Sequence, residues 1–415
     1  MKARIEVPLV RCVLLLGVLL LSGCSWFSWL PWVDKNDEKK AEEPAELPRF
    51  DAEIKLDKLW SASIGDGLGR KYLRLDPVVI ADRVCAADGY GVVECRDRFS
   101  GKRVWKTEIG QLPGGLLSGL NFFDRRDPSF VTGGVGSAFG MVLLGTTSGD
   151  VVALAASDGS ELWRANVGSE VLAPPVGGDD LVLVQTIDGR LLGLERTDGA
   201  VRWSYVNQVP VLTLRGTSTP MHDGGIVVAG FANGMVSAVR ESNGEPVWEH
   251  RVMLPQGRSE LDRMVDVDGT GIISGGIVYV VSYQGRLKAL RASDGSLLWE
   301  REMSSYLDLA EGYGQIYVVD DQDVITAIDE KSSEVVWRQE GLFRRKLSSP
   351  VAFSNYLVVA DGDGYVHVLA QSDGRFLGRR KIDGDGVRAR PVVADQQFYI
   401  LGNSGSLQAL EIELR

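Results

Sequence analysis

Histidine is nearly absent from this 415-residue chain, which contains only His222, His250 and His367. The three residues are widely separated and show none of the spacings typical of metal-ligating histidines. The sequence also lacks a G-x-S-x-G motif, a phosphate-binding loop and any Ser/His/Asp set that we can assemble. We therefore nominate no catalytic residue, no metal site and no cofactor, and the sequence favours a binding scaffold over an enzyme.

An excess of basic residues and a long apolar run are missing as well. The 45 Lys and Arg residues are outnumbered by 56 Asp and Glu residues, which gives a net charge of −11. A nucleic-acid-binding protein normally presents a basic face, so the charge argues against that class. The apolar run at residues 12–21 is too short for a typical transmembrane helix.

This short apolar run fits a signal peptide instead, because a basic segment precedes it. The run leads into "LSGC", the lipobox of bacterial lipoproteins, so we expect residues 1–23 to be removed and Cys24 to be lipidated. An ordinary cleaved signal with a chance cysteine is the alternative. Aspartate after the lipidated cysteine favours retention in the inner membrane of Gram-negative bacteria. Ser25 therefore predicts a lipid anchor in the outer membrane, with the protein facing the periplasm.

Residues 24–50 are predicted to form a lipidated, flexible tether. The stretch "DKNDEKKAEEPAELP" is charged and contains proline, a composition that favours disorder. Trp26, Trp29 and Trp32 lie close to the expected lipid and could rest on the headgroups, where indole rings are favoured. Alternatively, this apolar part of the tether contacts its own folded domain.

Cysteine is scarce in the remaining chain, where only Cys85 and Cys95 are found. They flank "AADGYGVVE", a predicted hairpin that would place them opposite each other. An oxidising compartment permits a disulfide there. Two buried thiols remain an equal alternative, because cross-strand geometry often strains a disulfide.

Tryptophan marks a repeat. Segments such as "SDGSELW", "TDGAVRW" and "SDGSLLW" recur, and the tryptophan that ends each one marks the repeat. These marker residues are Trp60, Trp105, Trp163, Trp203, Trp248, Trp299 and Trp337. A glycine four residues before most markers, and another 14 residues before, indicate tight turns. The stretches between them alternate apolar and polar residues, as half-buried strands do. Four antiparallel strands in a repeat of about 40–45 residues predict a β-propeller blade.

The ends of the chain predict how the propeller closes. The last unit has three strands and no fourth, whereas residues 51–63 begin with an outer strand that has nothing before it. The N-terminal strand should therefore complete the C-terminal blade and pair the open edges of the ring. Counting the turn residues gives an all-β fold, an eight-bladed β-propeller over residues 51–415, in which the tryptophans pack between neighbouring blades.

Extra length falls between blades rather than within them. The excess precedes blade 2 at residues 106–137, blade 4 at residues 204–218 and blade 5 at residues 249–272. These connections open on one face of a propeller, so the last two are expected to be neighbours. Loops on a rigid scaffold commonly carry function, and we expect function on that face.

The repeats also resemble those of quinoprotein dehydrogenases, which are eight-bladed and bind pyrroloquinoline quinone. A periplasmic dehydrogenase of this kind is the alternative function. Those enzymes use a vicinal cysteine pair over the quinone, and none occurs here. "DGDG" at 361–364 and 383–386 lacks the other ligands of a calcium loop. The first copy is expected to be a hairpin turn.

The lipobox, the tryptophan-marked propeller and two of the insertions together resemble the BamB family, the propeller lipoproteins of the outer-membrane β-barrel assembly machinery. The most specific segments are "LTLRGTSTP" and "SELDRMVDVD", although Ser259 and Glu260 are adjacent here. In that family these segments dock on a periplasmic POTRA domain of the barrel subunit, BamA. The resemblance implies a non-enzymatic scaffold that assists the folding and insertion of barrel proteins, with partner-binding residues Leu212, Leu214, Arg215, Asp266 and Asp268.

The residues themselves agree with this implication. Leu212 and Leu214 alternate with a threonine and can point the same way, so they could form a contact patch. Arg215 could lie between the carboxylates of Asp266 and Asp268 and hold the two loops in one shape. The alternative is that the leucines are buried and the charges only link the loops. Unfolded barrel precursors could also bind exposed sheet edges, and the sequence does not decide this.

Overall fold

The computed structural model describes residues 43–69, 71–110 and 131–415. The chain divides into two compact units, residues 1–44 and 45–415. Thirty-two strands and no helix are found in the described ranges, which therefore contain no helix that could cross a membrane. The predicted signal peptide, lipobox and first part of the tether lie outside these ranges.

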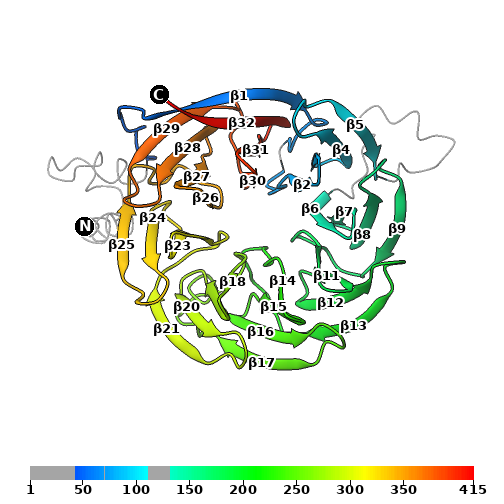
Figure 1. Ribbon diagram of the computed structural model, residues 1–415. Helices are drawn as coiled ribbons and strands as arrows, with labels where there is room; N and C mark the ends of the chain where they lie inside the picture. Colours follow the sequence, from blue (N-terminus) through cyan, green and yellow to red (C-terminus); the bar gives the residue numbers. More distant parts are fainter. Residues whose placement is uncertain (1–42, 70, 111–130) are drawn as a thin grey trace, which may run out of the picture. The chain divides into compact units, whose positions relative to one another are not determined.

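The second unit is a ring of eight four-stranded antiparallel sheets, which confirms the predicted propeller (Figure 1). Blade 1 contains β2 (Val78–Ile80), β3 (Arg83–Ala87), β4 (Val92–Asp97) and β5 (Arg103–Glu108). Blade 2 contains β6 (Val131–Ala138), β7 (Met141–Thr146), β8 (Asp150–Ala155) and β9 (Glu161–Asn166). Blade 3 contains β10 (Val176–Gly177), β11 (Leu181–Gln185), β12 (Arg190–Glu195) and β13 (Val201–Val206). Blade 4 contains β14 (Met221–Asp223), β15 (Ile226–Gly230), β16 (Met235–Arg240) and β17 (Pro246–Arg251).

The second half of the ring repeats this pattern. Blade 5 contains β18 (Ile272–Ser274), β19 (Ile277–Val281), β20 (Arg286–Arg291) and β21 (Leu297–Glu302). Blade 6 contains β22 (Ala310–Gly312), β23 (Gln315–Val319), β24 (Ile325–Asp329) and β25 (Val335–Gln339). Blade 7 contains β26 (Val351–Phe353), β27 (Tyr356–Ala360), β28 (Tyr365–Ala370) and β29 (Phe376–Lys381). Blade 8 contains β30 (Val392–Ala394), β31 (Gln397–Leu401), β32 (Ser406–Leu414) and β1 (Ile54–Ser63).

Blade 8 closes the ring as the sequence predicts. β1, from the start of the propeller, pairs antiparallel with β32, from its end, in a register that runs from Ile54 opposite Leu414 to Ser63 opposite Ser406. Pairing first and last strands in one sheet satisfies backbone groups that would otherwise form an open edge. Ile54 also packs against Gly378 of blade 7, the position where the repeat lacks its tryptophan.

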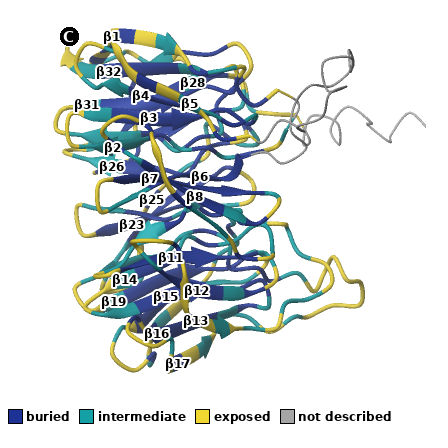
Figure 2. Cartoon of the chain, turned by 90° about the vertical axis from the view of Figure 1, so that its right-hand side faces the viewer, coloured by how far each residue is buried: buried dark blue, intermediate teal, exposed yellow. Residues whose placement is uncertain are grey.

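The burial pattern explains why these segments form strands. The middle strands β7 and β11 are buried along their whole length, because sheets cover them on both faces. The outer strand β13 alternates, and only Trp203 is buried along it. Figure 2, a view from the side of the ring, shows buried strands across its middle and exposed turns at its two faces.

The tryptophans join neighbouring blades, as predicted. Trp203 of blade 3 donates its indole N–H to the carbonyl of Glu241 in blade 4. The other six markers make the equivalent bond to the next blade. A Cβ atom added at Gly244 would lie 2.7 Å from the Trp203 ring. The marker glycines therefore serve two purposes, a positive φ in the turn and space for the preceding tryptophan.

Cys85 and Cys95 lie opposite each other on β3 and β4, and the structure joins them by a disulfide bond. Both side chains are completely buried. Of the two alternatives left open by the sequence, the structure contains the bonded one.

The start of the propeller is held against blade 7, and the compact unit begins at Ala45, six residues before the boundary expected from the sequence. The Ala45 carbonyl accepts a hydrogen bond from Arg345 at 3.0 Å. The Pro48 carbonyl accepts one from Arg379 at 3.2 Å, and Phe50 stacks on Phe376. Residues 45–50 are thus fixed rather than part of a free tether.

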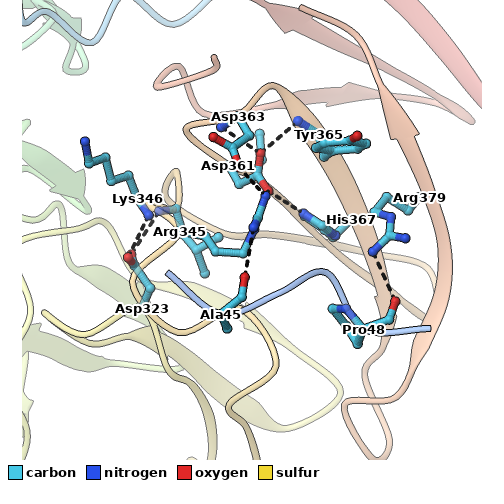
Figure 3. A network of polar contacts seen from close by, with 12 residues as sticks. Ala45, Pro48, Asp323, Arg345, Lys346, Asp361, Asp363, Tyr365, His367 and Arg379 are labelled. Atoms are coloured by element: carbon cyan, nitrogen blue, oxygen red, sulfur yellow. Dashed lines mark hydrogen bonds and ion pairs between the residues drawn. The ribbon is translucent and has the colours of Figure 1, made fainter. Parts of the chain in front are cut away.

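Arg345 belongs to a buried polar network in blade 7 (Figure 3). Its guanidinium contacts the Asp361 carboxylate at 2.8 Å and the Asp363 carboxylate at 2.6 Å. His367, which is fully buried, contacts the same Asp361 at 3.0 Å. Burial lowers the pKa of His367, with the Asp361 hydrogen bond acting against it. The first "DGDG" stretch is the turn between β27 and β28, as expected, and Asp361 serves as an internal acceptor.

Candidate protein-interaction site

Two long connections lie side by side on one face of the ring, the 207–220 loop before blade 4 and the 252–271 loop before blade 5. The Leu214 N–H donates to the Asp266 carboxylate at 2.6 Å, and the Thr219 N–H donates to the Thr270 hydroxyl at 3.3 Å. The expectation that these insertions are neighbours is confirmed. Figure 2 shows exposed loops that reach beyond the strands on one side of the ring.

Asp266 links the two loops from a buried position. Its side chain has no exposed surface, and burial raises its pKa to about 6 although the Leu214 N–H acts in the opposite direction. Oδ1 of this carboxyl has no hydrogen-bond partner among the described residues. Asp266 therefore holds the backbone at Leu214 in place through a buried hydrogen bond between the two loops.

Asp268 packs against the same loop at Gly216. A Cβ atom added at Gly216 would lie 2.2 Å from Oδ2 of Asp268, so a side chain at this position would displace the carboxylate. Burial and the nearby Asp266 raise the pKa of Asp268 to about 7, and Arg74 acts against this rise. The glycine of the "LRG" segment is thus required by a close contact between the loops.

Arg215 does not lie between Asp266 and Asp268, so the pairing that we expected is wrong. Its guanidinium contacts both oxygens of Glu170, at 2.8 and 2.9 Å, in the connection between blades 2 and 3. The side chain of Arg215 is 62% exposed, and its backbone has a left-handed φ of 57°. Asp266 is buried and Asp268 packs against Gly216, whereas the exposed Arg215 guanidinium pairs with Glu170.

The apolar residues of the loops differ in exposure. Leu212 is 39% exposed, whereas Leu214 is half-buried. Val211, which no pattern in the sequence marks, is fully exposed. On the neighbouring loop Leu254 and Leu261 are exposed as well. Burial of both leucines, the alternative considered from the sequence, does not hold for Leu212.

A cavity of about 360 Å³ opens beside these loops. Its walls come from several connections and include Tyr72, Arg74, Thr132, Leu172, Leu214, Asp268, Tyr283 and Tyr306. The Arg74 guanidinium lies 5.2 Å from the centre of the Tyr306 ring. Aromatic and aliphatic walls with two guanidinium groups, from Arg74 and Arg215, and one carboxyl suit an apolar or aromatic side chain of a partner. No repeated signal in the sequence marks these residues, because they come from several connections, from the strand β6 and from the turn between β19 and β20.

Family comparison identifies the chain. A family model described as outer membrane protein assembly factor BamB matches residues 114–339 and 324–414. The BamB of Pseudomonas aeruginosa is 44% identical over 402 residues, which cover 97% of this chain and 98% of that protein. The crystal structure of BamB from Moraxella catarrhalis superposes with a TM-score of 0.75 at 27% identity, covering 86% of this chain and 100% of that chain.

A quinohemoprotein alcohol dehydrogenase from Pseudomonas putida shares the fold alone. It superposes with a TM-score of 0.67 at 14% identity, covering 86% of this chain and 76% of that chain. The two cysteines of the propeller are ten residues apart and bonded across a hairpin, so they do not form the vicinal pair of such enzymes. Fold, loops and sequence agree that this chain is a member of the family of the outer membrane protein assembly factor BamB.

Proposed function

We propose that this protein is a lipid-anchored, non-enzymatic scaffold that assists the assembly of outer-membrane β-barrel proteins. Its partner is a periplasmic POTRA domain of BamA, bound by the 207–220 and 252–271 loops. Family membership supports the role in outer-membrane protein assembly. The observation that carries the docking proposal is the joint fixing of the two loops by Asp266, which leaves Leu212 and Arg215 on the surface.

The arrangement suits binding because the loops are ordered before the partner arrives. Loops that are already fixed lose less conformational entropy on association. Glu170 holds the Arg215 guanidinium in one direction while leaving most of it exposed. Arginine and tyrosine side chains such as those around this cavity are enriched at the energetic centre of interfaces.

Arg215→Ala tests the proposal. Loss of an interface arginine that pairs with a charged group costs about 2–5 kcal/mol of binding, or at least about 30-fold in affinity. The measurement is capture of the soluble periplasmic domains of BamA, with thermal melts in parallel. Arg202→Ala is a matched control, because Arg202 lies on the outer strand β13 and forms a similar pair with Glu195 of β12.

Leu212→Ala and Leu214→Ala should each weaken capture less than Arg215→Ala, and strongly when combined. Wild-type capture by Arg215→Ala would show that the partner docks elsewhere. A large fall in melting temperature for Arg215→Ala would show that the residue stabilises the fold instead.

The outer strands support a second role, binding of unfolded barrel precursors. Several blades expose an apolar side chain on the outermost strand; these are Leu59, Val104, Leu162, Val201, Leu297, Leu298, Val335 and Val336. An extended apolar segment can add to such a strand edge through main-chain hydrogen bonds. A photo-crosslinker at Leu298 should capture precursors in cells, whereas one at the exposed turn residue Ser372 should not.

A further inference from the structure

A second group of polar residues lies at the boundary of blades 3 and 4, away from the cavity. Asp179 lies in the turn between β10 and β11, His222 lies on β14, and Glu241 follows β16. Nε2 of His222 is 2.6 Å from Glu241 Oε2 and 3.6 Å from Asp179 Oδ2. The three potential ligand atoms all lie within 4.8 Å of one another.

Glu241 is held rigidly in its place. Its carboxylate accepts backbone N–H groups from Asp179 at 2.9 Å, Asp180 at 3.0 Å and Leu181 at 3.2 Å. Burial acts to raise its pKa, but these N–H groups and His222 keep the pKa below the ordinary value. The side chain is only 6% exposed, so a fixed negative charge lies directly beside the imidazole.

Nε2 of His222 lies close to a carboxylate without forming a hydrogen bond to it. The atom is inaccessible to solvent and has no hydrogen bond among the described residues, even though a carboxylate oxygen lies 2.6 Å away. Buried polar atoms without a partner are rare in native proteins and call for an explanation. A cation bound by Nε2 and the two carboxylates would account for this close approach without a hydrogen bond.

We propose that Asp179, His222 and Glu241 form a binding site for a divalent transition-metal ion of the zinc class. Imidazole and carboxylate oxygens are ordinary ligands for Zn²⁺ at about 2.0–2.2 Å, which places tetrahedral ligands about 3.4 Å apart. The separation of His222 and Asp179 fits this spacing, and that of His222 and Glu241 must widen by less than about 1 Å. Asp179 is 70% exposed, which leaves a route from solvent and room for a water ligand.

Such a site would clamp two blades together. Asp179 belongs to blade 3 while His222 and Glu241 belong to blade 4, and the Glu241 carbonyl already accepts the indole N–H of Trp203. The same pair of blades is joined by the 207–220 loop at the other end of β13. A bound ion would therefore strengthen the blade boundary that carries this loop, independently of which partner the loop binds.

The test uses the full chain after treatment with a chelator. Titration with ZnSO₄ by calorimetry should give one ion per chain, and bound Zn²⁺ should raise the melting temperature. His222→Gln should lower the affinity at least about tenfold and abolish the rise in melting temperature. His250→Gln is the matched control, because His250 lies on β17 beside Lys288 and outside the cluster.

Asp179→Asn keeps the test decisive if His222→Gln does not fold, because this exposed residue can lose its charge without disturbing the core. It should also weaken Zn²⁺ binding. An absence of binding at 100 µM Zn²⁺, or equal binding by wild type and Asp179→Asn, would overturn the proposal. The close His222–Glu241 contact would then be an ion pair between an imidazolium and a carboxylate.

Discussion

At the scale of single residues, the tryptophan of the preceding blade favours glycine at the marker position of each turn. Six of the seven tryptophans lie over a glycine of the next blade, and blade 6 has Ser333 at this position instead. Ser333 takes the same left-handed backbone, with a φ of 61°. The ring of Trp299 above it is half-buried, whereas the other six are buried. A side chain at this position therefore weakens the contact between blades.

Substitution at these positions should change stability in opposite directions. Gly244→Ala adds a methyl group against Trp203 and strains the backbone, so the free energy of unfolding should fall by about 2–4 kcal/mol. Ser333→Gly relieves the left-handed strain, so the free energy of unfolding should rise by up to about 1 kcal/mol. Chemical denaturation of both variants measures this. A stabilised Gly244→Ala would contradict the packing argument.

Asp266 should make stability depend on pH. Burial raises its folded-state pKa to about 6, above the ordinary value of 3.8. The folded state thus binds the proton more tightly than the unfolded state does. The resulting contribution of Asp266 to the free energy of unfolding is fully present below about pH 4 and is lost as the pH rises through about 6. Asp266→Asn cannot ionise, so the fall in stability across this window should shrink by roughly 3 kcal/mol. Chemical denaturation at a series of pH values measures this. If the free energy of unfolding falls equally with pH for wild type and Asp266→Asn, the prediction is refuted.

At the scale of elements, the loops and the N-terminal segment owe their order to contacts with other blades. The 207–220 loop forms no strand, yet Asp266 and Gly216 determine its path. Residues 45–50 also form no strand, and hydrogen bonds from Arg345 and Arg379 hold them on blade 7. Ordered segments of this kind depend on a few side chains rather than on a ladder of backbone bonds.

Arg379→Ala should release the N-terminal segment without unfolding the propeller. The change removes the hydrogen bond to Pro48 and the contact with the Phe50 ring. Amide exchange of residues 45–52 should rise at least about tenfold, while the stability loss stays near 1 kcal/mol. Arg375→Ala is the control, because its exposed ion pair with Glu53 contributes little. Unchanged exchange after Arg379→Ala would show that other contacts hold the segment.

At the scale of the whole molecule, closure and anchoring are separate properties. The pairing of β1 with β32 closes the ring within residues 45–415. The proposed lipid on Cys24 precedes this unit by 20 residues, a stretch that spans at most about 70 Å when extended. Loss of the lipid should therefore leave the fold unchanged.

Cys24→Ala should block lipidation and release the protein from the outer membrane. A single acyl chain binds membranes only marginally, whereas the several chains of a lipoprotein hold firmly. Membrane fractionation in cells that lack the barrel subunit measures the anchor alone, because partner binding cannot then retain the protein. Continued fractionation of Cys24→Ala with the outer membrane would refute the lipobox assignment, and an unchanged melting temperature is expected.

The sequence by itself determined the number of blades, the closure by the first strand and the positions of the long connections. These features depend on local periodicity, such as the constant spacing of turn glycines and tryptophans, which is readable along the chain. Only the tertiary structure decided that Arg215 pairs with Glu170, and that His222 meets Glu241. Both depend on the direction of side chains from different blades, which repeat spacing does not specify. The packing of a residue such as Trp203 over Gly244 depends in the same way on the rotation between successive sheets.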